Sequence, residues 1–339
     1  MINQKIRKER DMLKILFMGT PDFAKESLQA LYEAGENVIG VVTNPDKPQG
    51  RGMKLNVSPV KQYALEKNLP VYQPTKVRNN NEFLETVKNL APDLICVVAY
   101  GKILPQELLD IPPLGCINVH GSLLPKYRGA APIQWAVLNG DKVTGITTMY
   151  MDAGMDTGDM ILKEEVSIAE EETTGELWEC LSIIGGQLLL KTVSLIKEGK
   201  APREKQGENY TMAPMLQKEM AKIDWKTKTA VEIKNLIRGL NPIMGAYSFL
   251  EGKKLKFWRA KAYTEAQLLA EFPEMEPYAY KLKDITPGTV LFADSKQGLW
   301  IKAKEGALEI IEVQAENAKK MATADFLRGN TIPAGSTFE

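Results

Sequence analysis

The sequence contains one histidine, His120, and its neighbours could do acyl-group chemistry. Asn118 lies two residues before it, at the end of the apolar run CINVH, and the turn-forming stretch GSLLP follows. Residues two apart on an extended strand point to the same side, so an amide donor and an imidazole would converge there. A hydrogen-bonded structural histidine is the alternative, but the strand-end position and the Asn neighbour favour a functional site.

A carboxylate partner for this imidazole is offered by the stretch MDAGMDTGDM of residues 151–160. Asp152, Asp156 and Asp159 lie there among glycines. Such a segment is usually a turn with solvated acids, and the ligand spacing of a calcium-binding loop is missing. A carboxylate placed beside His120 would favour the protonated ring and allow it to carry a proton.

A third candidate is the loop NPDKPQGRGMK, residues 44–54. It carries Lys47, Arg51 and Lys54 together with two glycines, and it has no hydrophobic anchor. Most loops of this kind are simply solvated. The alternative is a mobile basic arm that contacts phosphates.

The elements that must position these residues alternate along the first half of the chain. Apolar runs that read as strands alternate with segments of helical spacing, and the strands are apolar on both faces, which predicts a mostly parallel sheet covered on both sides. The expected strands are residues 13–19, 37–44, 69–74, 92–101 and 115–119, followed by a strand pair at 144–152 and 159–168. The expected helices are residues 21–35, 58–68, 79–91, 105–111, 130–140 and 173–199. The fold class is therefore a Rossmann-like α/β domain, in which ligands bind at the carboxyl ends of the strands.

The second half of the chain has a different pattern. A polar stretch without periodicity, residues 201–213, reads as a linker, and a helix is expected at 228–242. Short alternating strands with tight turns follow, which predicts a small β-barrel or sandwich. The expected organisation is a tail at 1–11, a first domain at 12–200, the linker, and a second domain at 214–330.

Composition places the chain among ordinary globular proteins. Its 339 residues carry 43 basic and 43 acidic side chains, and the part after residue 213 has 19 basic against 16 acidic ones, so this part is expected to meet an anion. Cys96, Cys116 and Cys180 have no metal-binding spacing and are expected to be buried free thiols. We expect no signal peptide, no membrane span and a cytoplasmic location.

Several stretches together give a specific resemblance. GCINVHGSLLPKYRGAAPIQWAVLNGD resembles the central signature of the folate-dependent formyltransferases. KILFMGTPDFA, NPDKPQGRG and DAGMDTGDM, with the β-rich second half, are similar to members of that family that act on charged tRNA. The resemblance extends from about Met12 to near the C-terminus.

The resemblance implies a site and a reaction. Asn118, His120 and Asp156 match the catalytic trio, and Arg51, with Lys47 and Lys54 beside it, lies in the loop that enters the acceptor end of the tRNA. The folate loop corresponds to Ser122, Leu123, Leu124 and Pro125. The implied reaction moves the formyl group of 10-formyltetrahydrofolate to the α-amino group of methionyl initiator tRNA, with translation initiation as the purpose.

The resemblance also implies a C-terminal OB-like β-barrel domain that binds tRNA. It implies no tightly bound cofactor, no metal, no DNA or membrane partner, and a monomer. Three alternatives stay open: a relative that formylates an amino-sugar nucleotide or glycinamide ribonucleotide, a hydrolase that releases formate, and a non-catalytic RNA-binding protein.

Overall fold

The computed structural model describes residues 12–49, 54–272 and 284–339, so the expected tail at 1–11 and Arg51 lie outside the described residues. The chain forms two compact units. The first consists of the described parts of Met1–Pro132 with Val143–Ser167 and Trp178–Pro214. The second consists of Ile133–Lys142, Ile168–Leu177 and the described parts of Met215–Glu339. The domain boundaries expected from the sequence stay a prediction.

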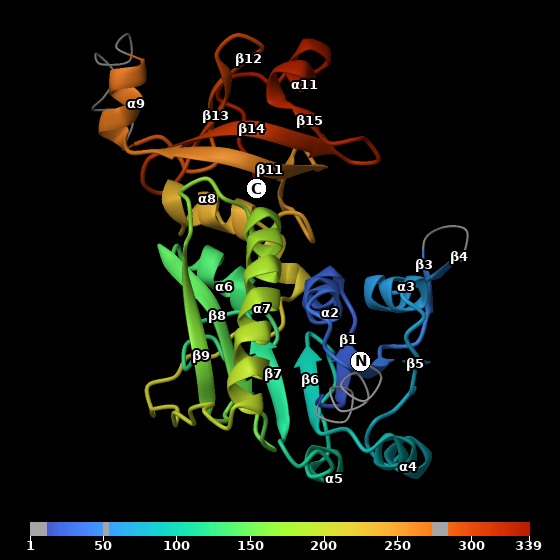
Figure 1. The fold of residues 1–339 in the computed structure, drawn as a ribbon. Helices are drawn as coiled ribbons and strands as arrows, with labels where there is room; N and C mark the ends of the chain where they lie inside the picture. The colour runs from blue at the N-terminus through green and yellow to red at the C-terminus, as the bar shows by residue number, and fades with distance from the viewer. Residues whose placement is uncertain (1–11, 50–53, 273–283) are drawn as a thin grey trace. The chain divides into compact units, whose positions relative to one another are not determined.

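A seven-stranded, mostly parallel sheet organises the first unit (Figure 1). Its strands, in spatial order, are β5 (Val71–Tyr72), β2 (Val38–Val42), β1 (Ile15–Gly19), β6 (Leu94–Val98), β7 (Cys116–His120), β8 (Val143–Tyr150) and β9 (Met160–Ser167). The pairs from β5 to β7 are parallel, whereas β7–β8 and β8–β9 are antiparallel. The Rossmann-like α/β prediction is confirmed.

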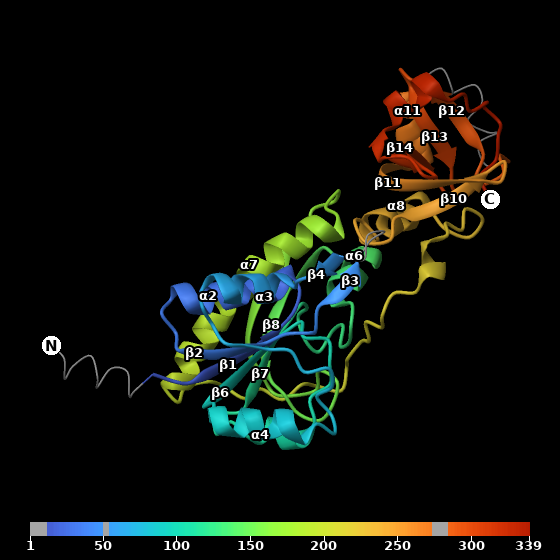
Figure 2. The same ribbon diagram turned by 90° about the vertical axis from the view of Figure 1, so that its right-hand side faces the viewer.

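Helices cover both faces of this sheet (Figure 2). One face carries α2 (Asp22–Glu33), α3 (Pro59–Glu66) and the part of α7 (Thr174–Lys197) that belongs to this unit; the other carries α4 (Asn81–Leu90) and α5 (Gln106–Leu109). Polar caps begin two of them, since the side chain of Ser58 accepts from the Lys61 amide and that of Asn80 from the Phe83 amide.

The long helix α7 is the one helix among the described residues that is long and apolar enough to cross a membrane. Half of its apolar stretch is buried within the structure. Its outer face includes Cys180, which is exposed and not buried as expected, because a helix beside a sheet buries only one side. Cys96 and Cys116 are buried free thiols, and burial raises the pKa of Cys116 to about 12.

The second unit is built around an antiparallel sheet. Its strands are β10 (Ala246–Leu250), β11 (Lys253–Tyr263), β14 (Ala307–Ala315), β13 (Gly298–Lys302) and β12 (Val290–Asp294), with β15 (Met321–Ala322) paired to β14. The other elements are α6 (Pro132–Leu138, from Ile133 onward in this unit), η1 (Lys218–Ala221), α8 (Ala230–Gly239), α9 (Glu265–Glu271) and α11 (Thr323–Gly329). One face of α8 packs with β11, β13 and β14 in a shared core. The β-rich second domain is confirmed, and its closure as an OB-like barrel stays a prediction.

The basic loop of residues 44–54 has more regular structure than its sequence indicates. It contains β3 (Lys47–Gln49), which pairs antiparallel with β4 (Lys54–Asn56). Backbone pairing needs no apolar pattern, so a hairpin in a polar segment leaves little signal in the sequence.

Candidate active site

Asn118 and His120 lie on one side of β7, at its carboxyl end. Between them, Val119 points the other way, toward Gly185 of α7, and Cys116 packs into the core under α4 and α5. The side-chain period of two therefore places Asn118 and His120 on the side away from α7, as the sequence predicts. In the part of the chain that the structure describes, the half-buried Asn118 amide has no hydrogen-bond partner, so it is available to a ligand.

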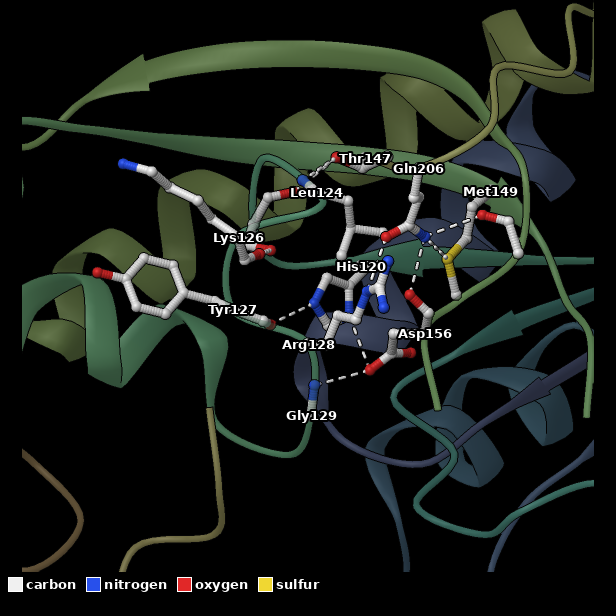
Figure 3. A network of polar contacts seen from close by, with 12 residues as sticks. His120, Leu124, Lys126, Tyr127, Arg128, Gly129, Thr147, Met149, Asp156 and Gln206 are labelled. Atoms are coloured by element: carbon white, nitrogen blue, oxygen red, sulfur yellow. Dashed lines mark hydrogen bonds and ion pairs between the residues drawn. The ribbon is translucent and has the colours of Figure 1, made fainter. Parts of the chain in front are cut away.

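His120 is fixed by contacts on both ring nitrogens (Figure 3). Its side chain is buried, and Nε2 lies 2.9 Å from the backbone oxygen of Tyr127. Since a carbonyl only accepts, Nε2 carries the hydrogen of this bond. Nδ1 faces Asp156, with 3.7 Å between Nδ1 and Oδ2. The ring thus points one nitrogen at a neutral acceptor and the other at an anion.

Of the three acids in the loop after β8, the structure brings Asp156 to His120. Asp156 Oδ2 also accepts from the Gly129 amide at 2.9 Å. Asp152 is used within the loop, where Oδ1 accepts from Gly154 and Thr157, and Asp159 lies 3.9 Å from Arg203. Asp156 itself has φ of 54°, a left-handed conformation that Asp tolerates better than most residues.

The segment from Ser122 to Pro125 forms a tight turn directly after β7. The Ser122 hydroxyl donates to the Lys126 carbonyl at 2.6 Å, and Thr147 Oγ1 links Ser122 O to the Leu124 amide at 2.7 and 3.0 Å. Ser122 and Leu124 are buried, whereas Leu123 and Pro125 are half-buried. The turn is therefore held by its own polar groups, and its partly open side chains are Leu123 and Pro125.

Two residues near this site carry no sequence signal that singled them out, Arg128 and Gln206. Arg128 Nε donates to Gln206 Oε1 at 2.8 Å, and Gln206 Nε2 donates to the carbonyls of Asp156 and Gly158 at 2.8 and 2.9 Å. Gln206 belongs to the stretch expected to be a linker. The structure places that stretch within the first unit, alongside the Asp156 loop.

The basic residues of the β3–β4 hairpin are not brought into contact with the trio by any interaction of the described residues. Lys47 is exposed, the backbone of Lys54 lies in β4, and Arg51 lies outside the described residues. The hairpin root, Asn44 and Asp46 just before β3, is however held by side-chain contacts. Lys61 Nζ contacts Asp46 Oδ2 at 2.5 Å and Gln73 Oε1 at 2.7 Å. The hydrogen bond from Lys61 lowers the pKa of the Asp46 carboxyl.

A second polar link joins the hairpin root to the sheet edge. Asn44 Nδ2 donates to Thr20 Oγ1 at 3.0 Å and to the carbonyl of Tyr100 at 2.9 Å. The turn after β6 that contains Tyr100 is tight, with Ala99 at φ of 44°. Burial raises the pKa of the Tyr100 phenol to about 12, which keeps it neutral. Asn44 and Tyr100 thus tie the hairpin to the edge of the sheet where the trio lies.

No group of three or more His, Cys, Asp or Glu side chains in residues 12–49, 54–272 and 284–339 is arranged to hold a metal ion. The chemistry available at this site is that of a free amide donor, an oriented imidazole and a carboxylate. Together these can stabilise an oxyanion and accept a proton, as acyl transfer to an amine requires.

Comparison with known proteins identifies the class of protein that this fold and site define. Residues 13–193 match the family described as formyl transferase, and residues 215–331 match the formyl transferase C-terminal domain. The chain belongs to the formyl transferase family.

Similar relatives within the family share one name. A methionyl-tRNA formyltransferase of Caldanaerobacter subterraneus subsp. tengcongensis is 50% identical over 96% of this chain and 99% of its own. A methionyl-tRNA formyltransferase of Clostridioides difficile is 48% identical over 95% of this chain and 99% of its own. The confirmed resemblance thus covers both halves of the chain.

Solved structures share the fold at lower identity. WlaRD, a sugar 3N-formyl transferase crystallised with dTDP and 5-N-formyl-THF, has a TM-score of 0.61 at 20% identity and covers 91% of this chain and 99% of its own. HypX from Aquifex aeolicus in complex with tetrahydrofolic acid has a TM-score of 0.59 at 17% identity, covering 93% of this chain and 47% of its own. At these identities the likeness concerns the fold alone.

Proposed function

We propose that this protein transfers the formyl group of 10-formyltetrahydrofolate to the α-amino group of methionyl initiator tRNA. The observation that carries the proposal is the match, along nearly the whole chain, to relatives named for that activity. The free amide of Asn118 beside the His120–Asp156 pair is consistent with it.

The reaction begins when the neutral amine of methionyl-tRNA attacks the formyl carbon. A new C–N bond forms, and the carbonyl oxygen becomes an oxyanion that needs fixed donors. Asn118 is the donor, because its amide is free and lies at the strand end; one such donor is typically worth ~10²–10³ in rate. The bond from the formyl carbon to the folate nitrogen then breaks, which leaves formylmethionyl-tRNA and tetrahydrofolate.

His120 and Asp156 manage charge and protons. With Nε2 donating to the Tyr127 carbonyl, the ring is held with Nδ1 facing the Asp156 carboxylate. In this proposal, a protonated ring at this position stabilises the oxyanion through its charge. Asp156 accepts the proton that the attacking amine loses. One proton is returned to the leaving folate nitrogen, so the exchange is balanced.

The remaining parts of the site bind the two substrates. One side of the folate-binding site is lined by the turn of Ser122, Leu123, Leu124 and Pro125. The side chains of Leu123 and Pro125 are its partly exposed ones. The β3–β4 hairpin with Lys47, Arg51 and Lys54 meets the acceptor end of the tRNA. The protein acts as a monomer in the cytoplasm.

A formylation assay tests this function. The protein is incubated with 10-formyltetrahydrofolate and charged initiator tRNA, a dTDP-linked amino sugar, or buffer alone. Formylmethionyl-tRNA should form in the first reaction only. Formylation of the amino sugar would favour a second candidate function, formyl transfer to a nucleotide-linked amino sugar. The fold that this chain shares with a sugar 3N-formyl transferase supports that candidate. Release of formate in buffer would indicate a hydrolase.

A further inference from the structure

We propose that Gln206 is a positioning residue that holds Asp156 in place beside His120. This inference rests on the proposed function, because it gives Gln206 a role through Asp156. Gln206 comes from the polar stretch after α7, and its side chain is half-buried among the loops that carry the site (Figure 3).

The carboxamide of Gln206 joins two loops. Both hydrogens of its NH₂ group are used by the Asp156 loop, at the carbonyls of Asp156 and Gly158, and its oxygen accepts from Arg128. No other side-chain type of this length offers two donors and one acceptor on one planar end. The pattern therefore specifies glutamine.

The Asp156 loop needs such a partner. Four of its residues from Asp152 to Met155 are exposed, so little packing holds it. Asp156 adopts a left-handed backbone that costs roughly 1–3 kcal/mol for a non-glycine residue unless its surroundings fix it. The hydrogen bond from Gln206 to the carbonyl of Asp156 acts on the same residue whose carboxylate faces His120.

The oxygen of the Gln206 carboxamide contacts Arg128, which belongs to the segment that orients the His120 imidazole. Arg128 lies between Tyr127, whose carbonyl accepts from His120, and Gly129, whose amide donates to Asp156. The Arg128 guanidinium also stacks on the Tyr210 ring at 4.5 Å. Through Arg128, Gln206 is therefore linked to the Tyr127 carbonyl that accepts from His120 and to the Gly129 amide that donates to Asp156. These two hydrogen bonds set the distance between His120 and Asp156.

The backbone of the same stretch reinforces this connection. Thr211 O and Oγ1 accept from the amides of Arg128 and Tyr127 at 2.8 and 2.9 Å, and Arg128 O accepts from the Ala213 amide at 2.7 Å. These bonds remain when the Gln206 side chain is changed. A Gln206 variant is therefore expected to lose the alignment of Asp156 while keeping the segment in place.

The test compares Gln206→Met and Gln206→Glu with the matched control Gln187→Met, at an exposed position of α7. Gln206→Met removes the hydrogen bonds to Arg128, Asp156 and Gly158, and Gln206→Glu keeps the acceptor for Arg128 but has no amide hydrogens. Each Gln206 variant should lower kcat about 10- to 100-fold. The KM values for both substrates and the thermal midpoint should stay near those of the wild type. Gln187→Met should match the wild type throughout.

A double-mutant cycle with Asp156→Asn separates positioning from a general structural role. If Gln206 acts through the carboxylate, Gln206→Met should change kcat less than about twofold in the Asp156→Asn background. A full additional loss there, or unfolding of both Gln206 variants, would overturn the inference.

The same experiment distinguishes this failure from that of the proposed function. Activity that survives in Gln206→Met but is lost in His120→Ala and Asp156→Asn would contradict the role of Gln206 alone. Formylation that is absent in the wild type, or unchanged in His120→Ala, would overturn the proposed function and this inference with it.

Discussion

His120 and Asp156 face each other with 3.7 Å between Nδ1 and Oδ2, while the opposite ring nitrogen is committed to the backbone. In the proposed mechanism, this geometry gives His120 and Asn118 different roles. The imidazole cannot turn without losing its bond to Tyr127, so the ring is held in place beside the Asp156 carboxylate. Among the described residues, Asn118 beside this pair keeps an amide without a hydrogen-bond partner, and the proposed mechanism uses that amide as the donor to the oxyanion.

Asn118→Ala should therefore reduce kcat by about 10²- to 10³-fold, roughly 2.7–4 kcal/mol of transition-state stabilisation. Binding of folate should change little, because the donor acts mainly on the oxyanion. Steady-state kinetics with charged tRNA measure the effect. Asn89→Ala, at an exposed position of α4, is the matched control. A loss confined to KM would mean that Asn118 binds substrate and does not stabilise the transition state.

A pH-dependent contribution to stability is expected from Glu176. Burial raises its pKa, but hydrogen bonds from Thr173 and the Arg259 guanidinium outweigh burial and hold the pKa at about 2, below the ordinary 4.5. A depressed folded-state pKa stabilises the protein above 4.5, and this contribution disappears as pH falls from 4.5 toward about 2.

Glu176→Gln should accordingly lower the free energy of unfolding at neutral pH by about 0.5–1 kcal/mol, a small value because the side chain is half exposed. The difference from the wild type should shrink below pH 4.5, the ordinary value of this group. Thermal unfolding followed by circular dichroism across this range is the measurement, with the exposed Glu179→Gln as control. A difference independent of pH would contradict the assignment.

The strand-end pair could be predicted from the sequence because its signal is local. Asn118 and His120 are two apart on a strand, and the period of two fixes their common side without knowledge of the rest of the fold. The alternation of apolar strands and helices likewise predicted the parallel sheet. Choosing Asp156 among three acids, by contrast, depended on the family resemblance.

Gln206 could not be found in this way. It lies 50 residues from Asp156 in the chain and sits in a polar stretch without periodicity, so neither spacing nor hydrophobic pattern marks it. The exposure of Cys180 was missed for a related reason. An apolar helix sequence does not show which of its faces the sheet leaves open.

The anchored hairpin root gives a prediction about tRNA. Lys61→Met removes the cation that Asp46 and Gln73 share, so the hairpin should lose its fixed starting direction. The KM for charged tRNA should rise by about 3- to 10-fold, the range that a coupling of roughly 1 kcal/mol gives.

The KM for 10-formyltetrahydrofolate should stay within twofold in the Lys61→Met variant. Lys76→Met, at an exposed lysine beyond β5, controls for the loss of one positive charge. If Lys61→Met and Lys76→Met raised the KM for charged tRNA equally, the loss of one positive charge would explain the effect. The contact of Lys61 with Asp46 and Gln73 would then have no part in it.

A substitution of Gly129 tests whether the hydrogen bond from its amide to Asp156 is needed for activity. Its φ of 127° is unfavourable for other residues, and a Cβ there would lie 2.7 Å from the carbonyl oxygen of Ala213. Gly129→Ala must therefore shift the backbone whose amide donates to Asp156. We expect kcat to fall at least tenfold and the thermal midpoint to drop by several degrees. Gly207→Ala has open space around the added methyl group and should leave both quantities unchanged. Wild-type kcat in Gly129→Ala would mean that the Gly129–Asp156 hydrogen bond is dispensable for the reaction.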